Sequence, residues 1–290
     1  MEKSIVYFIK EITPENILKI YKQLGINLTG KIGIKFHSGE DGNQNFLTYD
    51  YFLPIQQELN ASLIECNTAY DGARDTLEKH KELMKKHEWS THFNVDILDS
   101  ESPDLELDIP NGKAIKKDFV GNHLVNYDGM LVLSHFKGHP MGGFGGALKQ
   151  LSIGCGSSYG KKYIHGAGKP EGNYWRTKQE LFIQAMADAA YAVNNYFKGR
   201  VAYINVMKNM SVDCDCCAVA EDPCLKDIGI LASLDPVSLD KACIDLIRNG
   251  DDKGKAHFLK RVESRKGELI LTDSATLGTG SLDYELIEIK

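Results

Sequence analysis

Short apolar runs alternate with segments of helical periodicity along the first half of the chain. Residues 4–9 form an apolar run of strand length, and Ile17 and Tyr21 then recur at the spacing of an amphipathic helix. Thr13 and Pro14 supply a suitable N-cap and first helical position. The pattern therefore predicts a strand followed by a helix.

The alternation continues along the next segments. Strands are predicted at residues 31–37 and 63–67, and helices at residues 51–59 and 75–87. Such a rhythm implies crossover connections and a mostly parallel sheet. Residues 90–120 differ, because short apolar runs are separated there by Ser-Pro and Pro-Asn-Gly, which indicates a small β-rich excursion.

The second half returns to longer elements. The predicted elements are a strand at 129–135, a helix at 147–153, a long helix at 177–197, strands at 200–206 and 228–232, and a helix that Asp235 and Pro236 begin. No linker rich in Pro, Gly or Ser divides the chain. We therefore expect a single α/β domain over residues 1–290, with a mostly parallel sheet flanked by helices.

Composition narrows the classes of partner. The net charge of -6 gives no general attraction to nucleic acid or to an anionic membrane. No apolar stretch approaches the length of a membrane span. The first ten residues carry acidic Glu2 and only a short apolar run, which predicts a strand rather than a signal peptide.

Seven cysteines are present, and Cys214, Cys216, Cys217 and Cys224 crowd into one segment. An odd, clustered set does not fit a secreted disulfide framework, so a reducing cytoplasmic setting is expected. Dense thiolates favour a thiophilic metal, with zinc or iron as candidates, or redox chemistry. A reduced, partly buried cysteine loop is the alternative.

The segment 133–155 holds the densest polar signal, LSHFKGHPMGGFGGALKQLSIGC. Its glycines free backbone amides, and the following helix start with Lys149 would form a seat for a small anionic molecule. The spacing matches neither the phosphate loop nor the dinucleotide-binding motif. A glycine-rich turn that packs a helix tightly onto the sheet is the alternative.

His135, Lys137 and His139 lie at the end of the strand before these glycines. Histidine can act as an acid or a base near neutral pH. The four-residue spacing of the two histidines would suit a metal on a helix, but Gly138 and Pro140 disfavour a helix there.

Other polar residues follow the predicted strands nearer the N-terminus, and ligands collect at the carboxyl ends of strands in open parallel sheets. The candidate catalytic residues are His37, His135, Lys137, His139 and Lys149. The candidate ligand-binding residues are Lys35, Asn67, Thr68, Arg74, Gly142, Gly143, Gly145 and Gly146. The candidate metal ligands are Cys214, Cys216 and Cys217.

Several motifs together resemble the uncharacterised iron-sulphur-centre protein family, also called domain of unknown function 362. They are KFHSGEDGN, ECNTAYDGAR, the glycine-rich segment above, DCDCC and DIGILASLDPVSLDKACIDL. Typical larger members carry a ferredoxin-like insertion with paired CxxCxxCxxxCP runs after the segment that is GKKYIHGAGKP here. This chain has no such run, so a ferredoxin-type four-iron cluster is not expected.

The resemblance implies that the strand-end residues serve a shared activity to which the insertion supplies electrons. We therefore interpret the chain as an enzyme or redox accessory that binds a small anionic ligand, with a metal as candidate cofactor and a redox partner as a second expected partner. The alternative is a non-catalytic carrier of a metal or ligand. Whether the chain is an enzyme stays open at this point.

Overall fold

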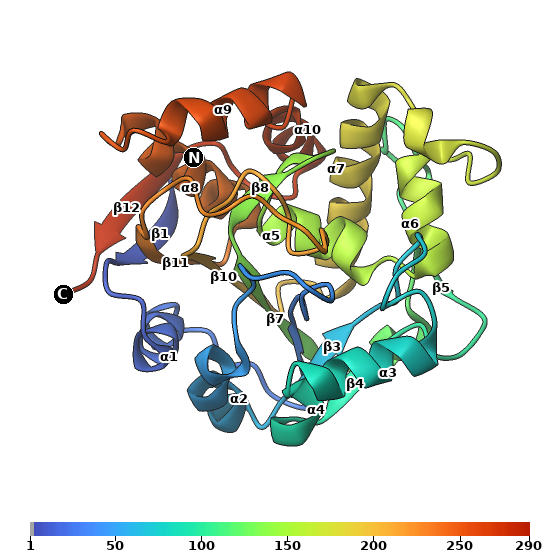
Figure 1. Ribbon diagram of the computed structural model, residues 1–290, viewed down its shortest axis with the longest axis horizontal. Coiled ribbons are helices and arrows are strands. Elements are labelled where there is room, and N and C mark those ends of the chain that lie inside the picture. The colour runs from blue at the N-terminus through green and yellow to red at the C-terminus, as the bar shows by residue number, and fades with distance from the viewer. Residues whose placement is uncertain (1–2) are drawn as a thin grey trace.

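One eight-stranded sheet runs through the molecule in the order β12-β1-β11-β10-β7-β2-β3-β4 (Figure 1). The computed structural model describes residues 3–290. The strands are β1 Ser4–Ile9, β2 Ile32–Lys35, β3 Ser62–Glu65, β4 Val95–Ile97, β7 Gly129–His135, β10 Val201–Met207, β11 Gly229–Ser233 and β12 Tyr284–Glu288. Within this part of the chain, β11 alone runs antiparallel to its neighbours, so the predicted mostly parallel α/β sheet is confirmed.

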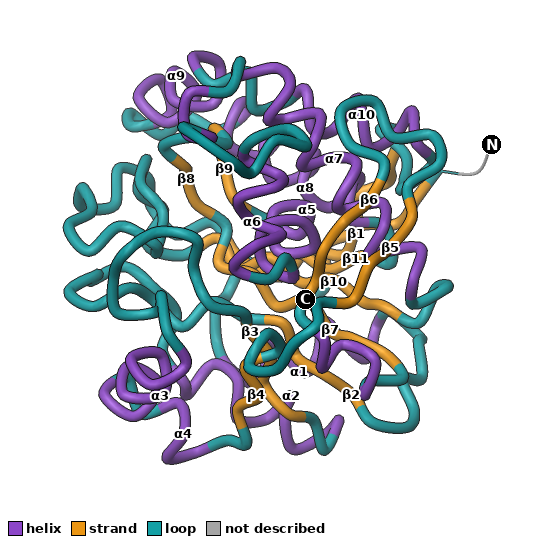
Figure 2. The backbone as a smooth tube through the Cα atoms, turned by 90° about the vertical axis from the view of Figure 1, so that its right-hand side faces the viewer, coloured by secondary structure: helices purple, strands orange, loops and turns teal. Residues whose placement is uncertain are grey.

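Helices cover both faces of the sheet (Figures 1 and 2). On one side lie α1 Pro14–Gln23, α2 Leu53–Leu59, α3 Leu77–Lys86 and α4 Trp89–His92. On the other lie α5 Ala147–Lys149, α6 Ser158–His165, α7 Gln179–Tyr196, α8 Pro236–Asn249, α9 Lys255–Ser264 and α10 Leu269–Leu277. Side chains of β7 alternate between the two cores, with Met130 and Val132 in one and Leu131 and Leu133 in the other.

The predicted helix caps form as the sequence indicates. The Thr13 hydroxyl accepts a hydrogen bond from the Asn16 amide at the start of α1. The Asp235 carboxylate accepts from the amides of Val237 and Ser238 at the start of α8. Each cap satisfies backbone donors that a helix start leaves free.

The region 90–120 is partly as predicted. β5 Leu105–Asp108 and β6 Lys117–Val120 form an antiparallel hairpin. β4, in contrast, belongs to the main sheet, because it pairs in parallel with β3. The elements α4, α6, α9, α10 and β12 were not predicted. Glu2, used above to argue against a signal peptide, lies outside the described residues.

The strands that precede the candidate site are adjacent and parallel. β3 pairs with β2, β2 with β7, and β7 with β10. Their carboxyl ends therefore share one edge of the sheet, as expected for His37 and His135. Among residues 3–290, no helix has the length and apolar character needed to span a bilayer.

Candidate functional site

A cavity of about 290 Å³ lies at this edge of the sheet. Seven of its lining residues were among the candidates: Lys35, His37, Thr68, Arg74, His139, Lys149 and Cys216. The other polar and aromatic lining residues are Glu65, Cys66, Tyr70, Gln150, Lys161, His165 and Trp175. The volume is near the lower end of the usual range for ligand pockets, about 300–1,000 Å³, which fits a small molecule.

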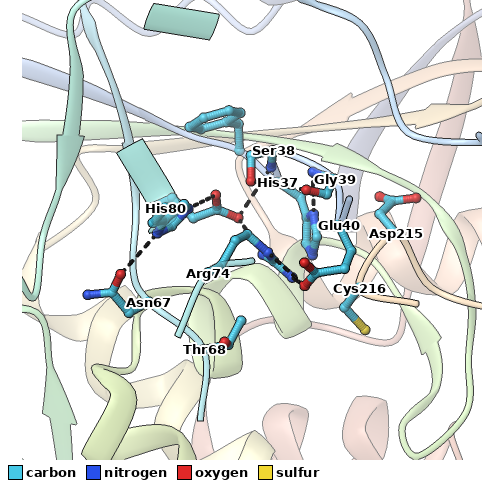
Figure 3. A network of polar contacts seen from close by, with 12 residues as sticks. His37, Ser38, Gly39, Glu40, Asn67, Thr68, Arg74, His80, Asp215 and Cys216 are labelled. Carbon is cyan, nitrogen blue, oxygen red and sulfur yellow. Dashed lines mark hydrogen bonds and ion pairs between the residues drawn. The ribbon is translucent and has the colours of Figure 1, made fainter. Parts of the chain in front are cut away.

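Arg74 anchors one wall of the cavity through a buried ion-pair network (Figure 3). Its guanidinium contacts the Glu40 carboxylate at 3.2 Å and the Glu65 carboxylate at 3.3 Å. Burial alone would raise the pKa of Glu65, but its hydrogen bond with His80 and the charge of Arg74 hold it well below its usual range. Both acids thus compensate Arg74, which leaves the guanidinium little free charge for a ligand.

His80 extends this network away from the cavity. Its Nδ1 lies 3.1 Å from the Asn67 Oδ1 and its Nε2 lies 3.1 Å from the Glu65 carboxylate. Asn67 donates its amide hydrogen to Asp99, which fixes its oxygen toward His80. Asn67 therefore supports the wall from behind and does not line the cavity.

His135 and Lys137 are held together by Asp215. The His135 Nδ1 lies 2.8 Å from one Asp215 oxygen, and the Lys137 ammonium lies 2.7 Å from the other. Burial would raise the pKa of Asp215, but His135 and Lys137 lower it. The two predicted catalytic residues thus fix the cysteine loop to the end of β7, and neither lines the cavity.

Lys35 and Lys161 are different, because their buried ammonium groups contact only neutral oxygens. Lys35 donates to the Phe36 carbonyl and, at 2.9 Å, to the Gln150 Oε1. Lys161 donates to the Gly156 carbonyl at 2.6 Å. Neither forms an ion pair with a carboxylate of the described residues. Burial lowers the pKa of Lys35.

The thiol of Cys214 lies behind the cavity wall, fully buried. Its sulfur is 3.6 Å from the Lys149 ammonium and 3.4 Å from the Cys216 amide nitrogen. Burial would raise the pKa of this thiol, but the hydrogen bond from Cys216 and the charge of Lys149 hold it well below its usual range. Cys216, in contrast, faces the cavity and is partly exposed.

His139, Cys214 and Cys216 form a possible metal site, since their ligand atoms all lie within 4.8 Å of one another. Cys217 is not part of this group. The hydrogen bonds of His139 do not suit a metal, however, because its Nδ1 accepts from the amides of Met141 and Gly142. A metal-binding Nε2 would require a hydrogen on Nδ1, which would then face two donors.

Two further histidines face the cavity in neutral form. Burial, followed by the charge of Arg74, lowers the pKa of His37 well below its usual range, and its Nδ1 accepts from the Gly39 amide. Burial, with smaller effects of His139 and Lys149, lowers the pKa of His165 to about 3. The Nδ1 of His165 is buried and has no hydrogen-bond partner among the described residues.

The glycine-rich segment packs against the protein interior. Gly143 lies in β9 Gly143–Gly145, which pairs with β8 Lys137–His139. The amides of Ala147 and Leu148, at the helix start proposed as an anion seat, donate instead to the Asp240 carboxylate at 2.8 and 3.0 Å. Gly142, Gly143, Gly145 and Gly146 do not line the cavity. A direct role of these glycines in ligand binding stays a prediction.

Comparison with known proteins places the chain in a family. Residues 32–245 match the family model described as domain of unknown function (DUF362). The chain belongs to this family. All residues that line the cavity fall within the part that matches DUF362. The cavity is therefore a feature of the DUF362 domain itself.

Two solved structures resemble this DUF362 protein. The lactate racemase apoprotein from Thermoanaerobacterium thermosaccharolyticum is 16% identical with a TM-score of 0.43, and the match covers 69% of this chain and 50% of that one. A protein from Thermotoga maritima is 10% identical with a TM-score of 0.46, covering 92% of this chain and 60% of that one. The chain thus spans less than two thirds of either. No curated protein matches it.

Lys161 and His165 were missed although the sequence carries a signal for them. They are four residues apart on α6, so they share one face of this helix. Glu65 is the last residue of β3, and Cys66 follows it directly. The prediction from strand ends selected only residues further along the chain. The missing information was the way in which α6 packs across the sheet edge.

Proposed function

We propose that this DUF362 protein is an enzyme or redox accessory that binds a small anionic molecule in the cavity, beside the thiol of Cys216. The charge balance of the cavity wall supports this proposal. Four cationic side chains line it, namely Lys35, Arg74, Lys149 and Lys161, against the single carboxylate of Glu65. A chain with a net charge of -6 thus concentrates positive charge at one buried place.

The observation that carries the proposal is the pair of ammonium groups on Lys35 and Lys161. Arg74 is compensated by Glu40 and Glu65, and Lys149 lies against Cys214. Among residues 3–290, Lys35 and Lys161 have only neutral acceptors. A buried charge without a direct ion-pair partner is costly, so a bound anion would stabilise both ammonium groups.

The nearby acid Asp118 does not remove this charge. Burial raises the pKa of Asp118 to about 8, against a lowering effect of Lys161. The carboxyl group is therefore largely protonated at neutral pH and adds little negative charge beside Lys161.

The uncharged side chains of the cavity indicate the apolar part of the ligand. His165 places an unpaired Nδ1 at the wall, and its ring stacks on Phe182 at a centroid distance of 4.6 Å. Trp175 lies 4.6 Å from the same ring. A small carboxylate or phosphate with a short apolar part fits this combination of charged donors and flat apolar surfaces.

Calorimetric titration with inorganic phosphate, acetate and oxalate tests the proposal. Lys161→Met and Lys35→Met should each weaken the binding of the preferred anion by roughly tenfold or more, since a hydrogen bond to a charged group contributes about 1.5–3 kcal/mol. Lys162→Met is the matched control, because Lys162 is the next residue of α6 and does not line the cavity. Equal affinities in all variants would contradict the proposal.

A metal carrier is the second candidate, and the convergence of His139, Cys214 and Cys216 favours it. These residues would hold zinc or iron, provided that the His139 ring exchanges its present hydrogen bonds. Elemental analysis of protein purified without oxygen tests this candidate. One zinc or iron per chain that disappears in Cys214→Ser would favour the carrier.

A further inference from the structure

The cysteine loop holds two thiols in unequal surroundings. The sulfur atoms of Cys214 and Cys216 lie within 4.8 Å of each other. Cys214 is fully buried against Lys149, whereas Cys216 is partly exposed and lines the cavity. An accessible thiol beside a buried one suits a two-step thiol–disulfide exchange, because one sulfur can attack the substrate and the other can resolve the mixed disulfide.

We propose that Cys216 and Cys214 carry out thiol–disulfide exchange with a small disulfide that bears a carboxylate. This inference rests on the proposed function, since the substrate would reach Cys216 through the anion-binding cavity. It goes beyond that function because it names the reaction, the substrate class and the role of each sulfur.

The reaction is balanced in atoms and electrons. The Cys216 sulfur attacks one sulfur of the substrate and gives up its proton. The substrate disulfide bond breaks, and one half leaves with the electron pair and that proton as a thiol. The Cys214 sulfur then attacks the Cys216 sulfur, and its proton leaves with the second half of the substrate. The second half leaves, so that two electrons have passed from the cysteine pair to the substrate.

Three neighbouring groups support these steps. The Cys216 amide nitrogen and the Lys149 ammonium lie 3.4 and 3.6 Å from the Cys214 sulfur, so both would stabilise the charge that this sulfur develops when it attacks. The His139 Nε2 lies 3.9 Å from the Cys216 sulfur. Because the Nδ1 of His139 accepts from two amides, its Nε2 carries the hydrogen of the neutral ring and offers a donor to sulfur.

The sequence spacing predicts how the product behaves. A disulfide between Cys214 and Cys216 would close a ring with a single intervening residue, Asp215, which His135 and Lys137 hold in place. Strained disulfides are easily reduced, so the oxidised pair should pass its oxidation on to another thiol. The pair is therefore suited to turnover rather than to permanent cross-linking.

The experiment uses the full chain, reduced and freed of metal by a chelator, with dithiodiglycolate as the anionic disulfide and hydroxyethyl disulfide as its neutral counterpart. Released thiol and the mass of the protein are followed. Wild type should release both halves of the substrate and end with an internal disulfide. Cys214→Ser should release one half and stop as a mixed disulfide on Cys216. Cys216→Ser should release neither, and Cys224→Ser should behave as wild type.

Several results would overturn the inference. They are release by Cys216→Ser at the wild-type rate, a wild type that stops at the mixed disulfide, or a wild type that does not react. Phosphate titration of the same cysteine variants separates this failure from failure of the proposed function, because anion binding needs neither sulfur. Wild type should also prefer dithiodiglycolate over the neutral disulfide by roughly tenfold, and Lys161→Met should remove that preference.

Discussion

The ammonium of Lys149 lies 3.6 Å from the sulfur of Cys214, and both groups are buried. The sequence predicted Lys149 as a candidate catalytic residue and part of an anion seat, and Cys214 as a candidate metal ligand. Burial alone would lower the pKa of Lys149, but the charge of Cys214 raises it. The contact therefore joins the glycine-rich segment and the cysteine loop into one site.

Lys149→Met should make the Cys214 thiolate harder to form. The low pKa of Cys214 depends in part on Lys149, so loss of this charge should move thiolate formation to higher pH. Ultraviolet thiolate absorbance as a function of pH measures the shift, and Lys162→Met serves as control. An unchanged titration would show that Lys149 does not stabilise the thiolate.

Asp118→Asn should remove a pH-dependent loss of stability. Because the pKa of Asp118 rises from 3.8 to about 8 on folding, the folded state holds this proton more tightly. The free energy of unfolding should therefore fall as pH rises from about 4 to about 8, by on the order of 5 kcal/mol. Urea unfolding across this range should show a flatter profile for the variant. Parallel stability profiles of wild type and Asp118→Asn would contradict the raised pKa of Asp118.

Arg74→Met should destabilise the fold strongly. The substitution leaves Glu40 and Glu65 buried without their guanidinium partner. Removal of one member of a buried ion pair costs about 3–5 kcal/mol. Denaturant unfolding measures the loss, and exposed Arg176→Met is the control. A loss of less than about 1 kcal/mol, the typical contribution of a surface ion pair, would mean that water replaces the guanidinium as the partner of Glu40 and Glu65.

Gly143→Ala should lower stability and leave anion affinity unchanged. Gly143 has a φ of +82°, and an added Cβ would lie 2.9 Å from the Gly267 Cα. Gly72→Ala is the control, because its Cβ would meet no atom closer than 3.6 Å. Thermal unfolding and phosphate titration on the same samples distinguish packing from binding. Weaker phosphate binding by folded Gly143→Ala would instead support an anion-binding site at the glycines.

Periodicity and strand-end reasoning predicted the sheet, its parallel character and the shared edge of His37 and His135. They could do so because strand spacing and caps are local properties of the chain. Which side chains meet was harder to predict, because long-range packing decides it. Asp240 accepts a hydrogen bond at the start of α5 but lies almost one hundred residues after the glycine-rich segment. Asp215 binds His135 and Lys137 and holds both away from the cavity.

Alkylation of Cys216 by iodoacetate and by iodoacetamide tests the central claim most directly. The two reagents differ in charge and in intrinsic reactivity, so their rate ratio at Cys216, divided by the same ratio for free cysteine, reports whether the cavity attracts a small anion to this thiol. This normalised ratio should favour iodoacetate, inorganic phosphate should compete, and Lys161→Met should abolish the preference, whereas Lys162→Met should keep it. A normalised ratio in wild type that favours iodoacetamide, unaffected by phosphate or by Lys161→Met, would contradict anion binding in this cavity.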